Sequence, residues 1–178
     1  MKKWLFLMIL VLMIGISCTV MPTKKVDYYF PKTNEISIDK VEVFEGLKRD
    51  SFTGQVKDIG KPVDVDNDVH YQKLVSEYLK ALKTKLSEEG FVIIKDKPTS
   101  QSLILKTKIN DDKPIKGLGW TTFGQGTVLI ETSVYQNETM LLSFSHAANY
   151  SIFSIETQVK RLTPLVAKKI KKELLPSD

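Results

Sequence analysis

Two segments of this chain carry apolar residues at helical spacing, and each segment has only one apolar stripe. The first stripe consists of Tyr71, Leu74, Val75, Tyr78, Leu79, Leu82 and Leu86. The second, within about 154–174, consists of Ile155, Val159, Leu162, Val166, Ile170 and Leu174. A helix with a single apolar stripe has to bury it against another layer of the fold. The chain is therefore expected to form two helices that share one partner surface.

The ends of these helices are marked by short-range signals. Asp66, Asn67 or Asp68 can cap the first helix, and Gly90 ends it where a positive φ costs little. Pro164 interrupts the second segment. Either the helix kinks there, or Thr163 caps a fresh helix that has the proline in its first turn.

The partner surface is predicted by segments whose apolar and polar residues alternate. Alternation over 35–44 slips once between Ile38 and Val41, which predicts a bulged strand. Residues 91–94 and 103–109 predict further strand, and 127–135 and 140–144 predict a hairpin across Gln136-Asn137-Glu138. Residues 45–68 read as a long loop with a short strand near 52–56. The fold class is therefore α+β in the order β-α-β-β-β-α, with both helices on one face of a mostly antiparallel sheet.

The N-terminus has the pattern of an export signal. Lys2 and Lys3 precede residues 4–16, which are apolar apart from Gly15 and span about 20 Å as a helix at ~1.5 Å per residue. That length falls short of the roughly 20 residues a spanning helix needs, so we interpret 1–17 as a removed signal peptide. Residues 18–34 then form a tether and 35–178 a single domain.

The chain's only cysteine follows this segment directly. The stretch Gly15-Ile16-Ser17-Cys18 resembles a lipobox, with cleavage between Ser17 and Cys18 and acyl chains such as palmitate on the cysteine; it departs from the pattern at Gly15, where a Leu-like residue is usual. Thr19 in place of Asp favours the periplasmic side of the outer membrane of a bacterial cell envelope. An uncleaved anchor, or secretion with an incidental cysteine, is the alternative. The formal charge of +5 falls to about +3 without Lys2 and Lys3, so nucleic acid is not an expected partner.

A glycine-rich segment precedes the hairpin. It includes Gly117, Gly119, Trp120, Phe123, Gly124 and Gly126. With the helix and strand that come before it, this layout resembles an uncharacterised family of small bacterial envelope lipoproteins. More distantly it is similar to the auxiliary lipoproteins of ABC-type lipid transporters, through Tyr28-Tyr29-Phe30-Pro31, and to the lipopolysaccharide-assembly lipoprotein. These resemblances imply binding of another envelope component and no catalysis.

The remaining chemical groups predict no enzyme, metal or cofactor. His70 and His146 lack zinc-ligand spacing, and the sequence contains no G-x-S-x-G. Asp64, Asp66 and Asp68 read as a capping cluster because the rest of a calcium loop is missing. Lysines 168, 169, 171 and 172 suit either anionic lipid headgroups or a solvated helix end.

Three functions follow from these observations. The first is a lipid-anchored adaptor in an envelope assembly, with Trp120 and Phe123 either exposed to a partner or tucked into the core. The second is an accessory lipoprotein of a lipid or lipopolysaccharide transport system, and the third, least favoured, is a hydrolase. The sequence is also compatible with an oligomer.

Overall fold

The computed structural model describes residues 24–25, 31, 33–46, 48–49, 56–58, 60–95, 97–112, 126–150 and 154–175. In these ranges the strands are β1 (Lys24–Lys25), β2 (Glu35–Glu45), β3 (Lys48–Arg49), β4 (Val56–Asp58), β5 (Lys61–Pro62), β6 (Val92–Ile93), β7 (Leu103–Asp112), β8 (Gly126–Gln136) and β9 (Thr139–Tyr150). The helices are a short 3-10 turn η1 (Val65–Asn67), α2 (Val69–Glu88) and α3 (Ile155–Leu174).

Seven of the strands form one mixed sheet. Its order is β1-β9-β8-β7-β2-β5, with β6 also pairing to β2, while β3 and β4 pair separately. Strand β2 runs parallel to β7 and β6, and the other pairs in the sheet are antiparallel. A parallel pair needs a crossover connection, and α2 lies within the one between β2 and β7. The predicted α+β class and the order β-α-β-β-β-α are confirmed.

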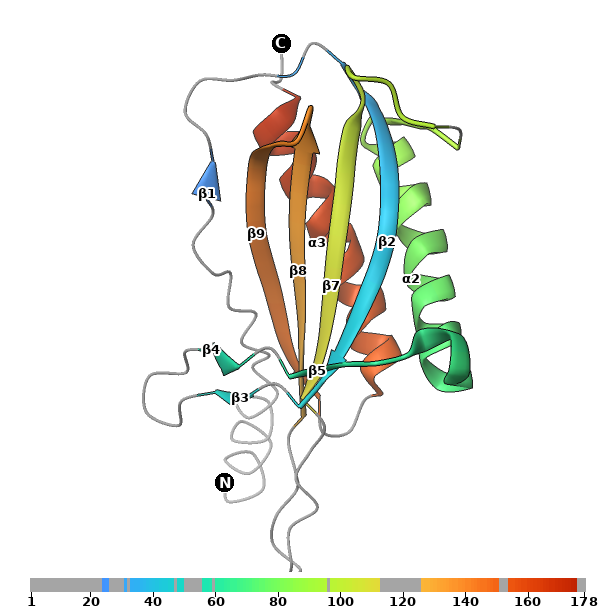
Figure 1. The fold of residues 1–178 in the computed structure, drawn as a ribbon, viewed down its shortest axis with the longest axis vertical. Coiled ribbons are helices and arrows are strands. Elements are labelled where there is room, and N and C mark those ends of the chain that lie inside the picture. Colours follow the sequence, from blue (N-terminus) through green and yellow to red (C-terminus); the bar gives the residue numbers. More distant parts are fainter. Residues whose placement is uncertain are drawn as a thin grey trace, which may run out of the picture.

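Both helices cover the same face of the sheet, as Figure 1 shows, and the predicted stripes form the core. All six residues of the α3 stripe are buried, as are Tyr71, Leu74, Tyr78, Leu82 and Leu86 of α2. They meet alternate residues of the central strands, including Leu105, Ile109, Ile130 and Val134. Removing this apolar area from water is the main stabilising contribution to the fold.

The two predictions for the ends of α2 are confirmed. Asp68 caps α2 by accepting from the backbone N–H groups of His70 and Tyr71, and Gly90 just beyond the helix has φ +95°. Of the two alternatives at Pro164, a fresh helix is wrong, because α3 runs through the proline as one helix. Thr163 starts no new helix: its hydroxyl donates to the Val159 carbonyl at 2.7 Å.

The strand irregularities were largely visible in the sequence. The register of β2 against β7 shifts between Ile38 and Val41, where the alternation slips, so the bulge is confirmed. The hairpin is tighter than expected, because Gln136 pairs with Thr139 and the loop has only two residues. Those residues, Asn137 and Glu138, have φ +47° and +66°, the type I′ pattern that matches the twist of the strands.

The segment interpreted as a tether contributes to the sheet. Lys24 and Lys25 pair antiparallel with Ser143 and Leu142 at the edge of β9. Pro31 is buried, and Asn34 donates from its side chain to the Gly90 carbonyl at 3.0 Å. The chain is therefore attached to the domain at several points before residue 35.

Candidate functional site

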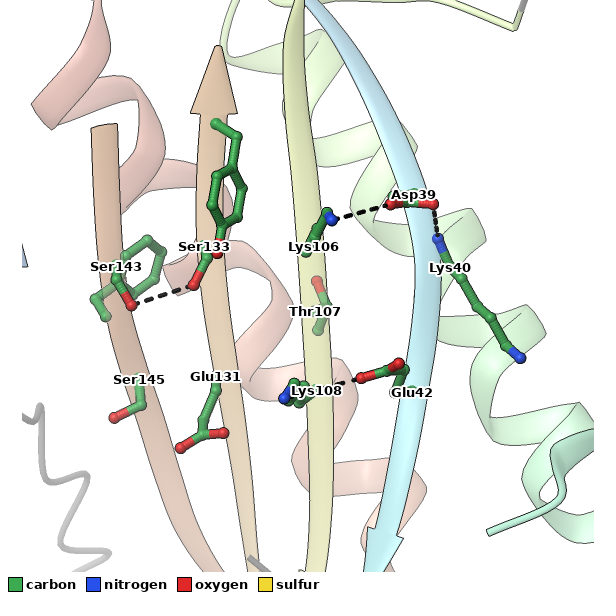
Figure 2. A pocket seen from close by; sticks show the side chains of 12 residues that line it. Asp39, Lys40, Glu42, Lys106, Thr107, Lys108, Glu131, Ser133, Ser143 and Ser145 are labelled. Atoms are coloured by element: carbon green, nitrogen blue, oxygen red, sulfur yellow. Dashed lines mark hydrogen bonds and ion pairs between the residues drawn. The ribbon is translucent and has the colours of Figure 1, made fainter. Parts of the chain in front are cut away.

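The face of the sheet opposite the helices, which we call the open face, is hollowed into a groove of about 660 Å³. Its polar lining comes from alternate residues of four neighbouring strands, whose other residues face the core. The side chains that line it are those of Asp39, Lys40 and Glu42 on β2, Lys106 and Lys108 on β7, Glu131, Ser133 and Tyr135 on β8, and Ser143 and Ser145 on β9. Figure 2 shows them along the four strands.

A row of positive charge runs along the middle of the groove. Lys106 lies 3.8 Å from a carboxylate oxygen of Asp39, and Lys108 lies 3.9 Å from one of Glu42. Each ammonium also lies over an aromatic ring. The Lys106 Nζ is 5.3 Å from the centroid of the Tyr135 ring, and the Lys108 Nζ is 5.5 Å from the centroid of the Phe44 ring. Long ion pairs between half-exposed side chains contribute little to stability, so a bound ligand displaces them at small cost.

The other side of the groove is rich in hydroxyl groups. Ser133 and Ser143 face each other across β8 and β9 with their oxygens 3.2 Å apart. Glu131 accepts a long hydrogen bond from the Asn110 side chain at 3.4 Å. The groove therefore carries charges of both signs on β2, positive charge on β7, and hydroxyl groups together with Glu131 on β8 and β9. This arrangement suits a polar ligand that exchanges many hydrogen bonds.

The groove's serines have no histidine partner within the described residues. His146 is buried on the opposite face, where its ring lies 5.4 Å from that of Phe144. Burial, followed by the charge of Lys169, lowers the pKa of His146 despite a hydrogen bond with the backbone of Leu165. Ser145 precedes it in β9, so the two side chains point to opposite faces. A hydrolytic pair is thus not formed by these residues.

A second polar cluster lies where β2, β7 and the first turn of α2 meet. The Tyr71 hydroxyl lies 2.5 Å from a carboxylate oxygen of Glu45 and 2.8 Å from one of Asp111. Burial, and then the hydrogen bonds with these two carboxylates, raises the pKa of Tyr71 well above its usual value. The two carboxylates are neighbours because Glu45 pairs with Asp111 in the parallel register. This cluster ties the crossover helix to the sheet.

Most of the sequence-predicted site residues lie outside the described part of the chain. These are Ser17, Cys18, Gly117, Gly119, Trp120, Phe123 and Gly124. Gly126 is described: it is buried, begins β8 and pairs with Tyr150. Of the acidic residues before α2, Asp68 caps the helix as expected, and Asp64 accepts from the side chain of Asn67 at 2.7 Å.

The described ranges contain no group of three or more side chains that could hold a metal ion. His70 instead lies 3.4 Å from Glu156. Neither α2 nor α3 is apolar enough along its length to cross a membrane.

Comparison with known proteins finds similarity in shape only. No protein-family model and no curated protein sequence matches the chain. A PDZ domain protein from Parabacteroides distasonis is 11% identical over 91% of this chain and 37% of its own, with a TM-score of 0.50. The PelC dodecamer from Paraburkholderia phytofirmans is 10% identical over 89% and 99% of the two chains, with a TM-score of 0.49. A minor lipoprotein from Acinetobacter baumannii is 11% identical over 78% and 90%, with a TM-score of 0.37.

The first of these similarities shows the fold alone, because identity is so low. The other two have TM-scores below 0.5 and support no statement about this chain. Part of the Parabacteroides protein thus shares this fold, and what this chain does has to be inferred from its own residues.

Proposed function

We propose that the protein is a lipid-anchored lipoprotein of a bacterial envelope that acts as an adaptor for another envelope component. The proposal depends chiefly on Cys18, which follows a short apolar segment and the small residue Ser17, with Lys2 and Lys3 in front. A helix too short to span the bilayer and a cysteine at its end are what signal removal and acylation require. Several acyl chains, at ~0.8 kcal/mol per buried CH₂, then hold the domain at a membrane.

The open face is the surface we propose for the partner. Its groove presents both signs of charge and a row of hydroxyls, so it discriminates between partners by electrostatic pattern more than by apolar burial. The space between helices and sheet is filled by packed side chains such as Leu82, Leu105 and Ile130, each fully buried. This packing favours an adaptor over the transport accessory that would hold acyl chains there.

Intact mass spectrometry of the membrane-extracted protein tests the anchor. The expected mass is that of a chain beginning at Cys18 with a diacylglycerol group, and Cys18→Ser should leave the unprocessed precursor. A native N-terminus elsewhere, or a cysteine without lipid, would sink the anchor and the adaptor with it.

Site-specific photocrosslinking in intact cells tests the open face. A crosslinking residue at Ser133, in the groove, should capture one partner in stoichiometric yield. The same residue at Lys83, exposed on α2, is the matched control and should not. Equal capture from both positions, or a monomer without partners at either, counts against the groove as the docking surface.

A further inference from the structure

The pairing of β1 with β9 determines which side of the domain lies nearest the proposed lipid anchor. Lys24 lies six positions after Cys18 in the sequence, and an extended chain covers at most ~3.6 Å per residue. Since Lys24 is paired with Ser143, the β9 edge lies within about 20 Å of the anchored cysteine. Figure 1 shows β1 beside β9, at the edge of the sheet away from α2.

Helix α3 has three cationic side chains without a carboxylate partner among the described residues. Arg161, Lys168 and Lys172 are exposed, and none of them forms an ion pair there. The lysines that face α2 are neutralised: Lys160 lies 2.8 Å from Glu77, and Lys171 lies 3.2 Å from Glu89. The contact with Lys160 also lowers the pKa of Glu77.

The free cations lie on a different side of α3 from the paired ones. At 3.6 residues per turn, Arg161, Lys168 and Lys172 lie roughly 80–120° around the helix from Lys160. Leu165, an apolar side chain that is 40% exposed, lies further round in the same direction. Helix α3 packs on β9, the strand that pairs with β1, and this places the helix next to the tethered edge.

We propose that this surface, Arg161, Leu165, Lys168 and Lys172, hereafter the basic flank, docks on anionic lipid headgroups and seats the domain on the membrane by its β9 side. The inference rests on the proposed anchor at Cys18. The short segment between Cys18 and Lys24 favours the basic flank, because it brings the β9 side of the domain within reach of the bilayer before the opposite side. The unpaired cations then hold the basic flank at the anionic headgroups, and the Leu165 side chain enters the headgroup layer.

The open face cannot take this role, because its groove contains Asp39, Glu42 and Glu131 beside its three lysines, so its positive charge is offset. Because α3 covers the other face of the sheet, docking by the basic flank leaves the groove clear of the lipid. The two surfaces therefore serve different contacts, one with the membrane and one with the proposed partner.

The test uses the full-length lipidated protein in vesicles of neutral phosphatidylcholine, with or without about a third phosphatidylglycerol. Cys18 is the chain's only cysteine, so lipid occupies it and an introduced cysteine is the single site for a spin label. Leu165→Cys labels the basic flank. Val92→Cys labels an exposed apolar position on β6 at the opposite edge, 54% exposed in the unlabelled protein. Relaxation by a lipid-bound nickel chelate reports how close each label lies to the headgroups.

We expect strong relaxation at position 165 and weak relaxation at 92 in anionic vesicles, with the difference lost in neutral vesicles or in 0.5 M salt. Each cation contributes roughly fivefold to the docked population, so reversing Arg161, Lys168 and Lys172 to Glu should lower the ratio of docked to undocked domain by roughly 100-fold or more. The matched control reverses Lys73, Lys80 and Lys83, which are also exposed but lie on α2, and should leave the ratio within about threefold.

Weak relaxation at 165 in a protein whose mass shows the lipid would overturn the basic flank and leave the anchor standing. Equal sensitivity to the two triple variants would show attraction by net charge alone and would overturn it too. A protein without lipid on Cys18 removes the proposed function itself, and the mass spectrum separates that failure from the other two.

Discussion

Two glycines with similar backbone angles should respond very differently to the same substitution. Gly60 has φ +83° and Gly90 has φ +95°, so alanine at either position is strained. A Cβ at Gly90 meets nothing within 4 Å, whereas one at Gly60 would overlap the backbone carbonyl oxygen of Glu45. The clash involves backbone on both sides, so no side-chain rotation relieves it.

The expected magnitudes follow from that difference. Gly90→Ala bears only the conformational penalty, about 1–2 kcal/mol. Gly60→Ala bears the same penalty and must also push β5 from β2, where Lys61 pairs with Glu45, for a total of at least ~3 kcal/mol. At about 3 °C per kcal/mol for a protein of this size, the melting temperatures should fall by about 3–6 °C and by about 9 °C or more.

Thermal unfolding of the protein in mild detergent, followed by far-ultraviolet circular dichroism, measures both losses. Each variant is compared with a serine at the same position, which carries the same backbone strain and a similar Cβ clash. Equal losses at positions 60 and 90 would refute the assignment of the extra cost to the contact with Glu45.

Three further predictions concern buried or capping polar groups. Burial lowers the pKa of His146 in the folded protein, so its contribution to stability is present above pH 6.5, the ordinary histidine value, and is lost as the pH falls below that value. The free energies of unfolding measured with urea at pH 7.5 and at pH 5 should therefore differ less for His146→Leu than for the wild type. Asp68→Ala removes the cap of α2 and should cost about 1 kcal/mol by urea unfolding, while Asp68→Asn should cost less than half as much. Tyr71→Phe takes a hydroxyl from two carboxylates and should cost about 1.5–3 kcal/mol, more than the ~1 kcal/mol for Tyr78→Phe, whose hydroxyl meets only Thr107; comparable losses would contradict this ranking.

The sequence predicted elements whose signal is local. The stripes of α2 and α3, the cap at Asp68, the end at Gly90 and the bulge after Ile38 each depend on spacing or on one residue type, and the structure agrees. At Pro164 local preference was overridden. The proline has no N–H for the Lys160 carbonyl, but α3 buries residues on both sides of it, including Leu162 and Val166, and this packing keeps the helix continuous.

The groove could not be predicted in the same way. Lys106 and Lys108 at alternate positions of a strand look like any solvent-facing residues. They become the centre of a groove only because β7 lies between β2 and β8, and strand order does not appear in hydrophobic periodicity. The cluster around Tyr71 was missed for a related reason: Glu45 and Asp111 meet it only through the parallel register of distant segments.

Antiparallel pairing of Lys24 and Lys25 also has a consequence for self-association. An uncovered outer strand offers its backbone N–H and C=O groups to any other chain that can extend the sheet. Lys24 and Lys25 occupy part of that position on β9, opposite Ser143 and Leu142. A variant of the chain that begins at residue 35 would leave this edge of β9 unpaired. We therefore expect the shortened chain to be less soluble, even though the helices and the central strands remain intact.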